Sequence, residues 1–294
     1  QPFKSSGMML TCLKESGITS PADFKGKTLG VWFGGNEYPF LNWMAKLGLK
    51  PDTDVKVLKQ GFNVDPLLQN QAACISTMIY NEYWQVVDAG VKESDLITFF
   101  YEKEGVASLE DGLYVLGPNL RDKAFVAKMA KFLKASFKGW NDAVKNPEEA
   151  AKIVVANDTS GSASLAVQKR QMENVAKLIS KAGTAQIGYL DPAAYERTVK
   201  VLLAAGSSPV IKKDPGKAGY SHVVWEAATG LAAVEISRSA DAAEVGHRQG
   251  DRPPPTEPPA GHLDVGAAVD RADEGVDHVV AVDHRLAGVG VARI

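Results

Sequence analysis

The sequence has few of the features that mark several protein classes. Its two cysteines, Cys12 and Cys74, lie in no CxxC pair and near no histidine cluster, so a zinc site has no support. It contains no run of about 18 uncharged apolar residues, so we expect no membrane span. The net charge of −2 over 294 residues gives no overall field for a polyanion or an acidic bilayer. Nucleic acid is therefore not an expected partner.

Catalytic patterns are equally scarce. The first of the five histidines is His222 and no GxSxG occurs, so nothing resembles a catalytic triad. The stretch Gly34-Gly35 fits neither GxGxxG nor GxxxxGK[ST], which excludes the common dinucleotide and nucleotide-phosphate loops. The two cysteines are interpreted as separate small buried side chains. A disulfide between them is the alternative, which the sequence leaves open.

The first half of the chain alternates short β-branched or aromatic runs with amphipathic stretches. This pattern is typical of βαβ units and a mostly parallel sheet. The predicted strands cover residues 28–33, 55–59, 74–80, 95–101 and 112–116, and the predicted helices between them cover residues 39–47, 65–71 and 82–89. The expected fold class is therefore α/β.

Beyond Gly117-Pro118 the pattern becomes helical. Large apolar residues recur at helical spacing from Phe125 to Phe137 and again from Met172 to Ile179. Asn146-Pro147 and Asp191-Pro192 each predict a helix that begins with proline. The last of these helices is expected to run to about residue 205.

The composition then changes abruptly. No lysine follows Lys217 and no aromatic residue follows Trp225, while Arg252-Pro253-Pro254-Pro255 is typical of extended chain. Such a segment lacks the large side chains that offset ordering entropy. Two explanations stay open, a disordered extension or an out-of-frame translation of the gene end, and we expect no function in this tail.

The stretch Gly34-Gly35-Asn36-Glu37 joins a predicted strand to a predicted helix. Backbone N–H groups at such a junction favour a phosphate or carboxylate, and glycine permits close approach. The alternative is a tight turn that binds nothing.

A second cluster, Tyr80-Asn81-Glu82-Tyr83, follows the strand predicted over residues 74–80. In an open parallel sheet it lies at the same edge as Gly34-Gly35. Its aromatic rings, amide and carboxylate suit a flat heterocycle. The alternative is structural, with Asn81 capping the helix, Glu82 complementing the helix dipole and Tyr83 in the core. Gly61 to Asp65 reaches the same edge, where Asp65 before Pro66 is a plain N-cap.

The residues also carry a family resemblance. The stretches DFKGKTLGVW, GGNEYPFLNWMAKLGL and GFNVDPLLQNQAACISTMIYNEYWQV resemble the second lobe of the NMT1/THI5-like family in motif order and spacing. The resemblance runs from about residue 1 to residue 227. It implies a type II periplasmic-binding-protein fold with two lobes joined by a hinge, of which the first lobe is N-terminally truncated.

The resemblance also implies a domain division. Residues 1–26 are expected to be a remnant of the first lobe and hinge, and residues 27–116 the second α/β lobe with the ligand loops. Residues 117–228 are expected to form a helical part that completes the lobes, and residues 229–294 the tail. By position, Gly34, Gly35, Asn36 and Glu37 match the family's polar-ligand loop, whereas Tyr80, Asn81, Glu82 and Tyr83 match its pyrimidine contacts.

The implied function is the substrate-binding component of an ABC importer for a thiamine pyrimidine precursor or similar heterocycle. Such a protein needs no cofactor, works with an ABC permease, and is periplasmic or at the cell surface. The alternative is the thiamine pyrimidine synthase of the same family, a cytoplasmic enzyme that uses pyridoxal phosphate, iron and one of its own histidines. That branch carries adjacent cysteines, which are absent here. A third possibility is an inactive truncated fragment.

Overall fold

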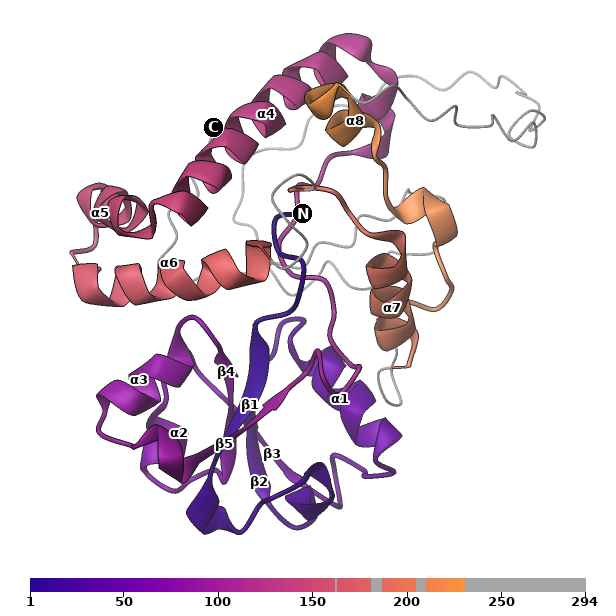
Figure 1. Ribbon diagram of the computed structural model, residues 1–294. Helices are drawn as coiled ribbons and strands as arrows, with labels where there is room; N and C mark the ends of the chain where they lie inside the picture. The colour runs from indigo at the N-terminus through magenta and orange to yellow at the C-terminus, as the bar shows by residue number, and fades with distance from the viewer. Residues whose placement is uncertain (162, 181–186, 205–209, 231–294) are drawn as a thin grey trace, which may run out of the picture.

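A computed structural model describes residues 1–161, 163–180, 187–204 and 210–230 of the chain. Within them a five-stranded sheet with short helices beside it forms the lower part of the molecule in Figure 1, and longer helices lie above it. The expected α/β class is confirmed. The predicted tail lies almost entirely outside the described residues.

The sheet has the strand order β3-β2-β4-β1-β5. Its strands are β1 (Met8–Leu13), β2 (Thr28–Val31), β3 (Lys56–Lys59), β4 (Cys74–Met78) and β5 (Leu96–Phe100). Strand β2 is parallel to β3 and β4, whereas β1 runs antiparallel to β4 and β5. Four strands therefore share one direction, as predicted, but two of the four pairings are antiparallel, so the sheet is mixed rather than mostly parallel.

Two strands differ from expectation. No strand was expected over β1, whose sequence MMLTCL suits a helix as well as a strand. It nevertheless lies between β4 and β5, where a continuous apolar run is buried on both faces. Strand β1 falls within residues 1–26, which the resemblance assigned to a first lobe and hinge.

The strand predicted over residues 112–116 is wrong. Leu113, Tyr114 and Leu116 are exposed, and no strand pairs with this segment among the described residues. β-Propensity reflects packing on a pleated surface, so it does not make a strand where neighbouring strands are absent.

The predicted helices are present with shifted ends. Those associated with the sheet are α1 (Glu37–Lys46), α2 (Asp65–Leu68) and α3 (Glu82–Asp88). The later ones are α4 (Lys123–Lys145), α5 (Pro147–Asn157), α6 (Leu165–Ser180) and α7 (Pro192–Leu203). A further helix, α8 (Val223–Thr229), was not predicted. Short 3-10 turns cover Lys14–Ser16, Pro21–Phe24, Glu93–Asp95, Gly117–Arg121 and Gly216–Gly219. None of the described helices is both long and apolar enough to cross a membrane.

The larger hydrophobic cluster joins the sheet to the helices above it. Near α1, the rings of Phe24, Trp43 and Phe99 contact one another with centroids 5.2 to 6.1 Å apart. Toward the upper helices, Phe3 lies 6.2 Å from both Tyr80 and Trp140. A smaller cluster packs α2 and α3 against the sheet through Val64, Leu67, Ala72, Ile75, Val86 and Leu96.

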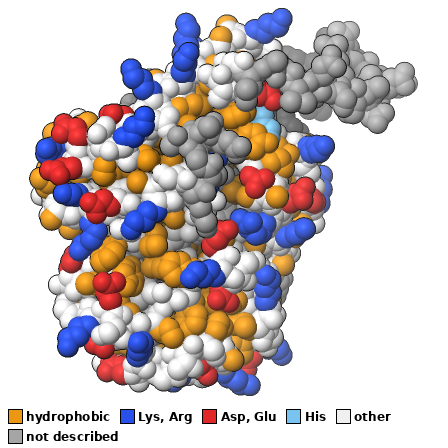
Figure 2. Space-filling view, in the orientation of Figure 1, with side chains coloured by type: hydrophobic (Ala, Val, Ile, Leu, Met, Phe, Trp, Pro, Cys, Tyr) orange, Lys and Arg blue, Asp and Glu red, His pale blue; other side chains and the backbone are white. Residues whose placement is uncertain are grey.

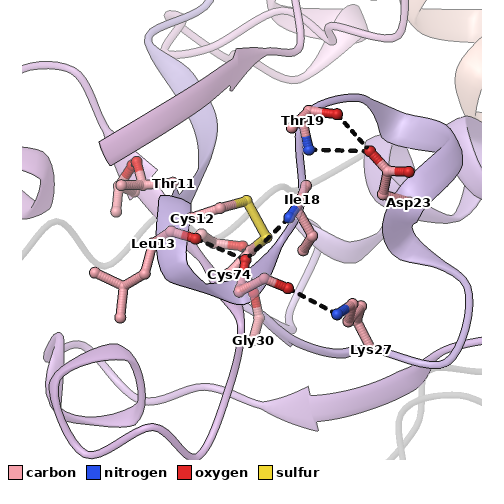
Figure 3. Close-up of a disulfide and its surroundings, with 12 residues drawn as sticks. Thr11, Cys12, Leu13, Ile18, Thr19, Asp23, Lys27, Gly30 and Cys74 are labelled. Carbon is pink, nitrogen blue, oxygen red and sulfur yellow. Dashed lines mark hydrogen bonds between the residues drawn. A yellow bond between two sulfur atoms is a disulfide. The ribbon is translucent and has the colours of Figure 1, made fainter. Parts of the chain in front are cut away.

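Cys12 and Cys74 form a disulfide between β1 and β4 (Figure 3). The two residues are paired in the register of these neighbouring strands, and both are fully buried. The interpretation as separate side chains is therefore wrong, and the disulfide alternative holds. Because the cross-link joins residues 62 positions apart, it stabilises the fold by about 4 kcal/mol if its effect is to restrict the unfolded chain.

Candidate functional site

Three segments converge at one edge of the sheet. Strands β2, β3 and β4 are parallel and adjacent, so the segments that follow them, residues 32–37, 60–64 and 79–83, leave from the same edge. Ligands of open α/β sheets bind outside the carboxyl ends of the strands. The shared edge of Gly34-Gly35 and Tyr80-Asn81-Glu82, predicted from the sequence, is confirmed. Whether these residues contact a ligand stays a prediction.

Buried polar contacts hold these segments in place. The side chain of Gln60 crosses β2 and bonds to both backbone groups of Ser76, accepting from its N–H at 2.8 Å and donating to its carbonyl at 2.9 Å. Gly30 lies beneath this amide, and a Cβ there would stand 3.2 Å from Gln60 Oε1. The indole N–H of Trp32 donates to the carbonyl of Gly61 at 2.9 Å. These hydrogen bonds therefore fix the strand ends from which the three segments leave.

The glycine loop is the open part of this edge. Gly34 and Gly35 have φ values of 90° and 121°, which favour glycine, and Gly34 is exposed. The N–H of Gly35 donates to Glu37 Oε2 at 2.7 Å. A carboxylate is the kind of group that amides before a helix bind. Glu37 therefore occupies one of the loop's own donors. Asn36 is half-exposed and makes no capping bond.

Tyr80, in contrast, lies inside the larger hydrophobic cluster, where 5% of it is exposed. Its ring is so close to Gly7 that a Cβ on that glycine would stand 3.0 Å from Tyr80 Cε1 and 3.1 Å from Leu178 Cδ1. Burial, followed by the charges of nearby carboxylates, raises the pKa of the Tyr80 hydroxyl well above its usual value. The ring is covered by segments distant in sequence.

The carboxylate of Glu82 is also buried. Its Oε2 accepts from the N–H of Met78 at 3.0 Å, and its Oε1 accepts from Asn81 Nδ2 at 2.9 Å. Burial raises the pKa of Glu82, and these hydrogen bonds oppose the rise. Asn81 precedes α3 without a side-chain capping bond, so the expectation that it caps this helix is wrong.

Tyr83 points to another part of the molecule. Its ring packs against the smaller hydrophobic cluster, and its hydroxyl donates to Glu93 Oε2 at 2.8 Å. Tyr80 and Tyr83 therefore belong to different clusters. The structure brings Tyr80, Asn81 and Glu82 together and leaves Tyr83 apart from them.

Sequence reasoning missed Glu110, which lies near Tyr80 and is 9% exposed. Its Oε1 and Oε2 accept from the N–H of Gly7 at 3.0 and 3.1 Å, and Oε1 also accepts from Ser6 Oγ. Burial, as the largest cause, raises the pKa of Glu110 to about 7. Its surroundings in the chain, SLEDGL, carry no signal of burial. Its partners, Ser6 and Gly7, lie 104 and 103 positions earlier in the sequence.

Two exposed phenylalanines at the same edge were also missed. Phe33 follows β2 and Phe62 follows β3, with 45% and 66% exposure. An aromatic residue within three residues of a strand end and beside a glycine is the sequence signal that marks both. They add aromatic surface next to the glycine loop.

A surface hollow lies at the opposite end of the strands. It is lined by residues around the start of β2 and β4, among them Lys27, Thr28, Asn70 and Ala73. None of the predicted site residues lines it. Within the described residues no group of three or more histidine, cysteine, aspartate or glutamate side chains is arranged to hold a metal ion.

These features define a class of protein. They describe an open α/β sheet with one antiparallel strand inserted beside β4 and with polar loops at the carboxyl edge, where open α/β sheets bind their ligands. The chain belongs to the NMT1/THI5-like family, whose model, described as "NMT1/THI5 like", matches residues 2–150. That family contains both ABC substrate-binding proteins and thiamine pyrimidine synthases.

Other comparisons are weaker. No curated protein matches the chain. Among solved structures, the desulfurization enzyme DSZB is similar with a TM-score of 0.40, and a cysteine-to-serine mutant of DSZB in complex with biphenyl-2-sulfinic acid with a TM-score of 0.42. In both cases the identity is 12% and the match covers 76% of each chain. Similarity at this level identifies no ligand.

Proposed function

We propose that this protein is the substrate-binding component of an ABC importer for a thiamine pyrimidine precursor or a similar small heterocycle. The observation that carries the proposal is the pair of buried carboxylates, Glu82 and Glu110, near Tyr80 at the carboxyl edge of the parallel strands. Carboxylates accept the N–H groups of an amino heterocycle, and an aromatic ring stacks on its face. Family membership supports the same class of ligand.

In this proposal the ligand lies between two walls, the glycine loop and the segment of Tyr80, Asn81 and Glu82, which bind different parts of it. The glycine loop from Gly34 to Glu37 binds a polar or anionic group of the ligand through backbone donors. Tyr80, Asn81 and Glu82 bind the ring. Because Phe3 and Leu178 cover Tyr80, the ligand enters only when these side chains move aside. Binding is the whole mechanism, and no cofactor is needed.

The disulfide supports export of the protein. Disulfides such as Cys12–Cys74 form and persist in oxidising compartments and are rare in the cytosol. A periplasmic or cell-surface location agrees with this chemistry. In that location the proposed partner is an ABC permease. The synthase alternative predicts a cytoplasmic enzyme, for which a buried structural disulfide is unusual.

Isothermal titration calorimetry with an aminopyrimidine tests the proposal. We expect saturable binding, and the Glu82→Gln variant should bind about ten-fold or more weakly because a charged acceptor is replaced by a neutral one. Glu93→Gln is the matched control, since Glu93 contacts Tyr83, which lies apart from Tyr80, Asn81 and Glu82. Thermal unfolding of each variant separates a loss of affinity from a loss of fold.

Two results contradict this function. If Glu82→Gln lowers stability but leaves the affinity unchanged, Glu82 serves only the start of α3. If the protein binds pyridoxal phosphate and loses a histidine in the presence of iron, as mass spectrometry would detect, it is a synthase.

A further inference from the structure

Helix α4 carries an excess of positive charge on one side. It contains six lysines and one aspartate, a net charge of +5 in a chain of net charge −2. Lys131, Lys134, Lys138 and Lys145 follow spacings of three, four and seven residues, which place them on one stripe. Lys123 lies in line with the stripe and Lys128 lies beside it. We call this stripe, with Lys123 and Lys128, the lysine face.

The opposite side of α4 is apolar and covered. Met129, Leu133, Phe137 and Trp140 recur on that side, and α4 packs against α6 and α8. All six lysines are exposed. Most residues between them on the outer side are small, namely Ala124, Ala127, Ala135 and Gly139, with Asn141 and Asp142 near the C-terminal end. Phe132 borders the face with 46% exposure. The lysine face is thus a nearly flat outer surface about 34 Å long.

The charges of this face are not neutralised within the part of the chain that the structure describes. None of the six lysines has a carboxylate oxygen within 4 Å there. Asp142, the one acid on α4, accepts from Asn146 Nδ2. Figure 2 shows lysine and arginine side chains along the upper rim of the molecule, where α4 lies in Figure 1.

The neighbouring helices differ in this respect. On α5, Lys152 forms ion pairs with Glu148 and Glu149, and Lys169 of α6 pairs with Glu148 at 2.9 Å. An exposed helix face whose charges serve solubility commonly pairs opposite signs in this way. The lysine face of α4 instead carries six lysines and a single acid, Asp142, which forms no ion pair with them.

We propose that the lysine face of α4 docks on an anionic phospholipid surface. Clusters of four to eight basic residues bind such surfaces, and each lysine near the surface strengthens binding by about five-fold. Phe132 lies where a ring enters the boundary between headgroups and acyl chains. The net charge of −2, which argued against an acidic bilayer, is an average that conceals this local field.

The composition of the face favours a bilayer over nucleic acid. Arginine, whose planar fork recognises phosphates and bases in two-pronged geometry, is absent from α4. The one asparagine of α4, Asn141, falls between Lys138 and Lys145 on the stripe, but its Oδ1 is buried, so it does not present the full amide that reads base edges. Lysines on a flat surface match the diffuse charge of headgroups. The proposal does not depend on the identity of the transported ligand.

Co-sedimentation of the full chain with vesicles tests the proposal. One set contains phosphatidylcholine alone, and the other contains phosphatidylcholine with about a third phosphatidylglycerol. The variant combines Lys131→Glu, Lys134→Glu and Lys138→Glu, and a second variant carries glutamine at the same positions. The matched control combines Lys14→Glu, Lys50→Glu and Lys92→Glu, three exposed lysines of the sheet region. Circular dichroism checks that every variant keeps its helices.

We expect the wild-type protein to bind only the anionic vesicles and to dissociate as the salt concentration rises. The α4 glutamate variant should bind about a hundred-fold more weakly than the wild type, and the glutamine variant should lose less affinity. The control should bind nearly as tightly as the wild type. Equal loss in the control overturns the proposal, because total charge then explains the effect. Binding to heparin without binding to anionic vesicles also overturns it.

Discussion

The two predicted walls of the ligand site lie at the same edge of the sheet, yet they differ in depth. The glycine loop is open, with Gly34 exposed and Asn36 half-exposed. The wall around Tyr80 and Glu82 is closed, with only 5% and 7% of these residues exposed. Strand topology determines which residues share an edge. It does not determine which of them solvent or a ligand reaches.

The difference arises from what covers each wall. Phe3, from the N-terminal segment, and Leu178, from α6, pack on Tyr80. In the glycine loop, the N–H of Gly35 is held by a local group, the carboxylate of Glu37, and among the described residues nothing lies within 4 Å of a Cβ placed on Gly34. The closed wall therefore contributes to the stability of the fold, and the open wall depends on backbone conformation. Three substitutions test this contrast.

The largest effect is expected from Tyr80→Ala. Removing a buried aromatic ring leaves a cavity beside Phe3 and Leu178, which should lower the free energy of unfolding by about 3 to 5 kcal/mol. Tyr83→Ala is the control, because Tyr83 is half-exposed and should cost about 1 kcal/mol. Denaturation with urea measures both. Equal losses would show that Tyr80 is no more deeply packed than Tyr83.

Local patterns in the sequence predicted much of the fold. The βαβ alternation located β2, β3, β4 and β5 and the helices between them, because each is encoded by its own residues. Strand β1 escaped because its run of methionine and leucine is ambiguous until β4 and β5 flank it. The sequence left the disulfide open for the same reason, since only the pairing of β1 with β4 brings Cys12 to Cys74.

The candidate site was less predictable for the same physical reason. The pattern placed Gly34-Gly35 and Tyr80 at one edge, which follows from strand direction alone. The burial of Tyr80 depends on Phe3 and Leu178, and the burial of Glu110 depends on Ser6 and Gly7. These contacts join residues about 75 to 105 positions apart, which no local period encodes.

The next effect concerns the pH dependence of the closed wall. Because the folded-state pKa of Glu110 is raised from 4.5 to about 7, its contribution to stability is fully present below pH 4.5. That contribution is lost as the pH rises through about 7, and it amounts to roughly 3 kcal/mol at most. Between pH 5 and 8, the free energy of unfolding of Glu110→Gln should therefore fall by less than that of the wild type.

Chemical denaturation across this pH range measures the difference between the two proteins. Glu15→Gln, which removes an exposed carboxylate at the far edge, is the matched control. A Glu110→Gln profile that parallels the wild type would show that the carboxylate is not buried in solution. The comparison with wild type cancels the other titrating groups.

The smallest effect is expected at the open wall. Gly34→Ala places a side chain at φ 90°, where nothing lies within 4 Å of the new Cβ, so its cost is backbone strain of about 1 to 2 kcal/mol. Gly61→Ala, at the same edge, also meets open space and has no positive φ, so it should change stability by less than about 1 kcal/mol. Denaturation of the two variants measures the difference.

If Gly34→Ala is as harmless as Gly61→Ala, the loop adopts another backbone conformation in solution, and the arrangement that lets Glu37 accept from the Gly35 N–H is not maintained. If it costs several kcal/mol more than expected, the loop is packed against other groups, and the contrast between an open and a closed wall fails.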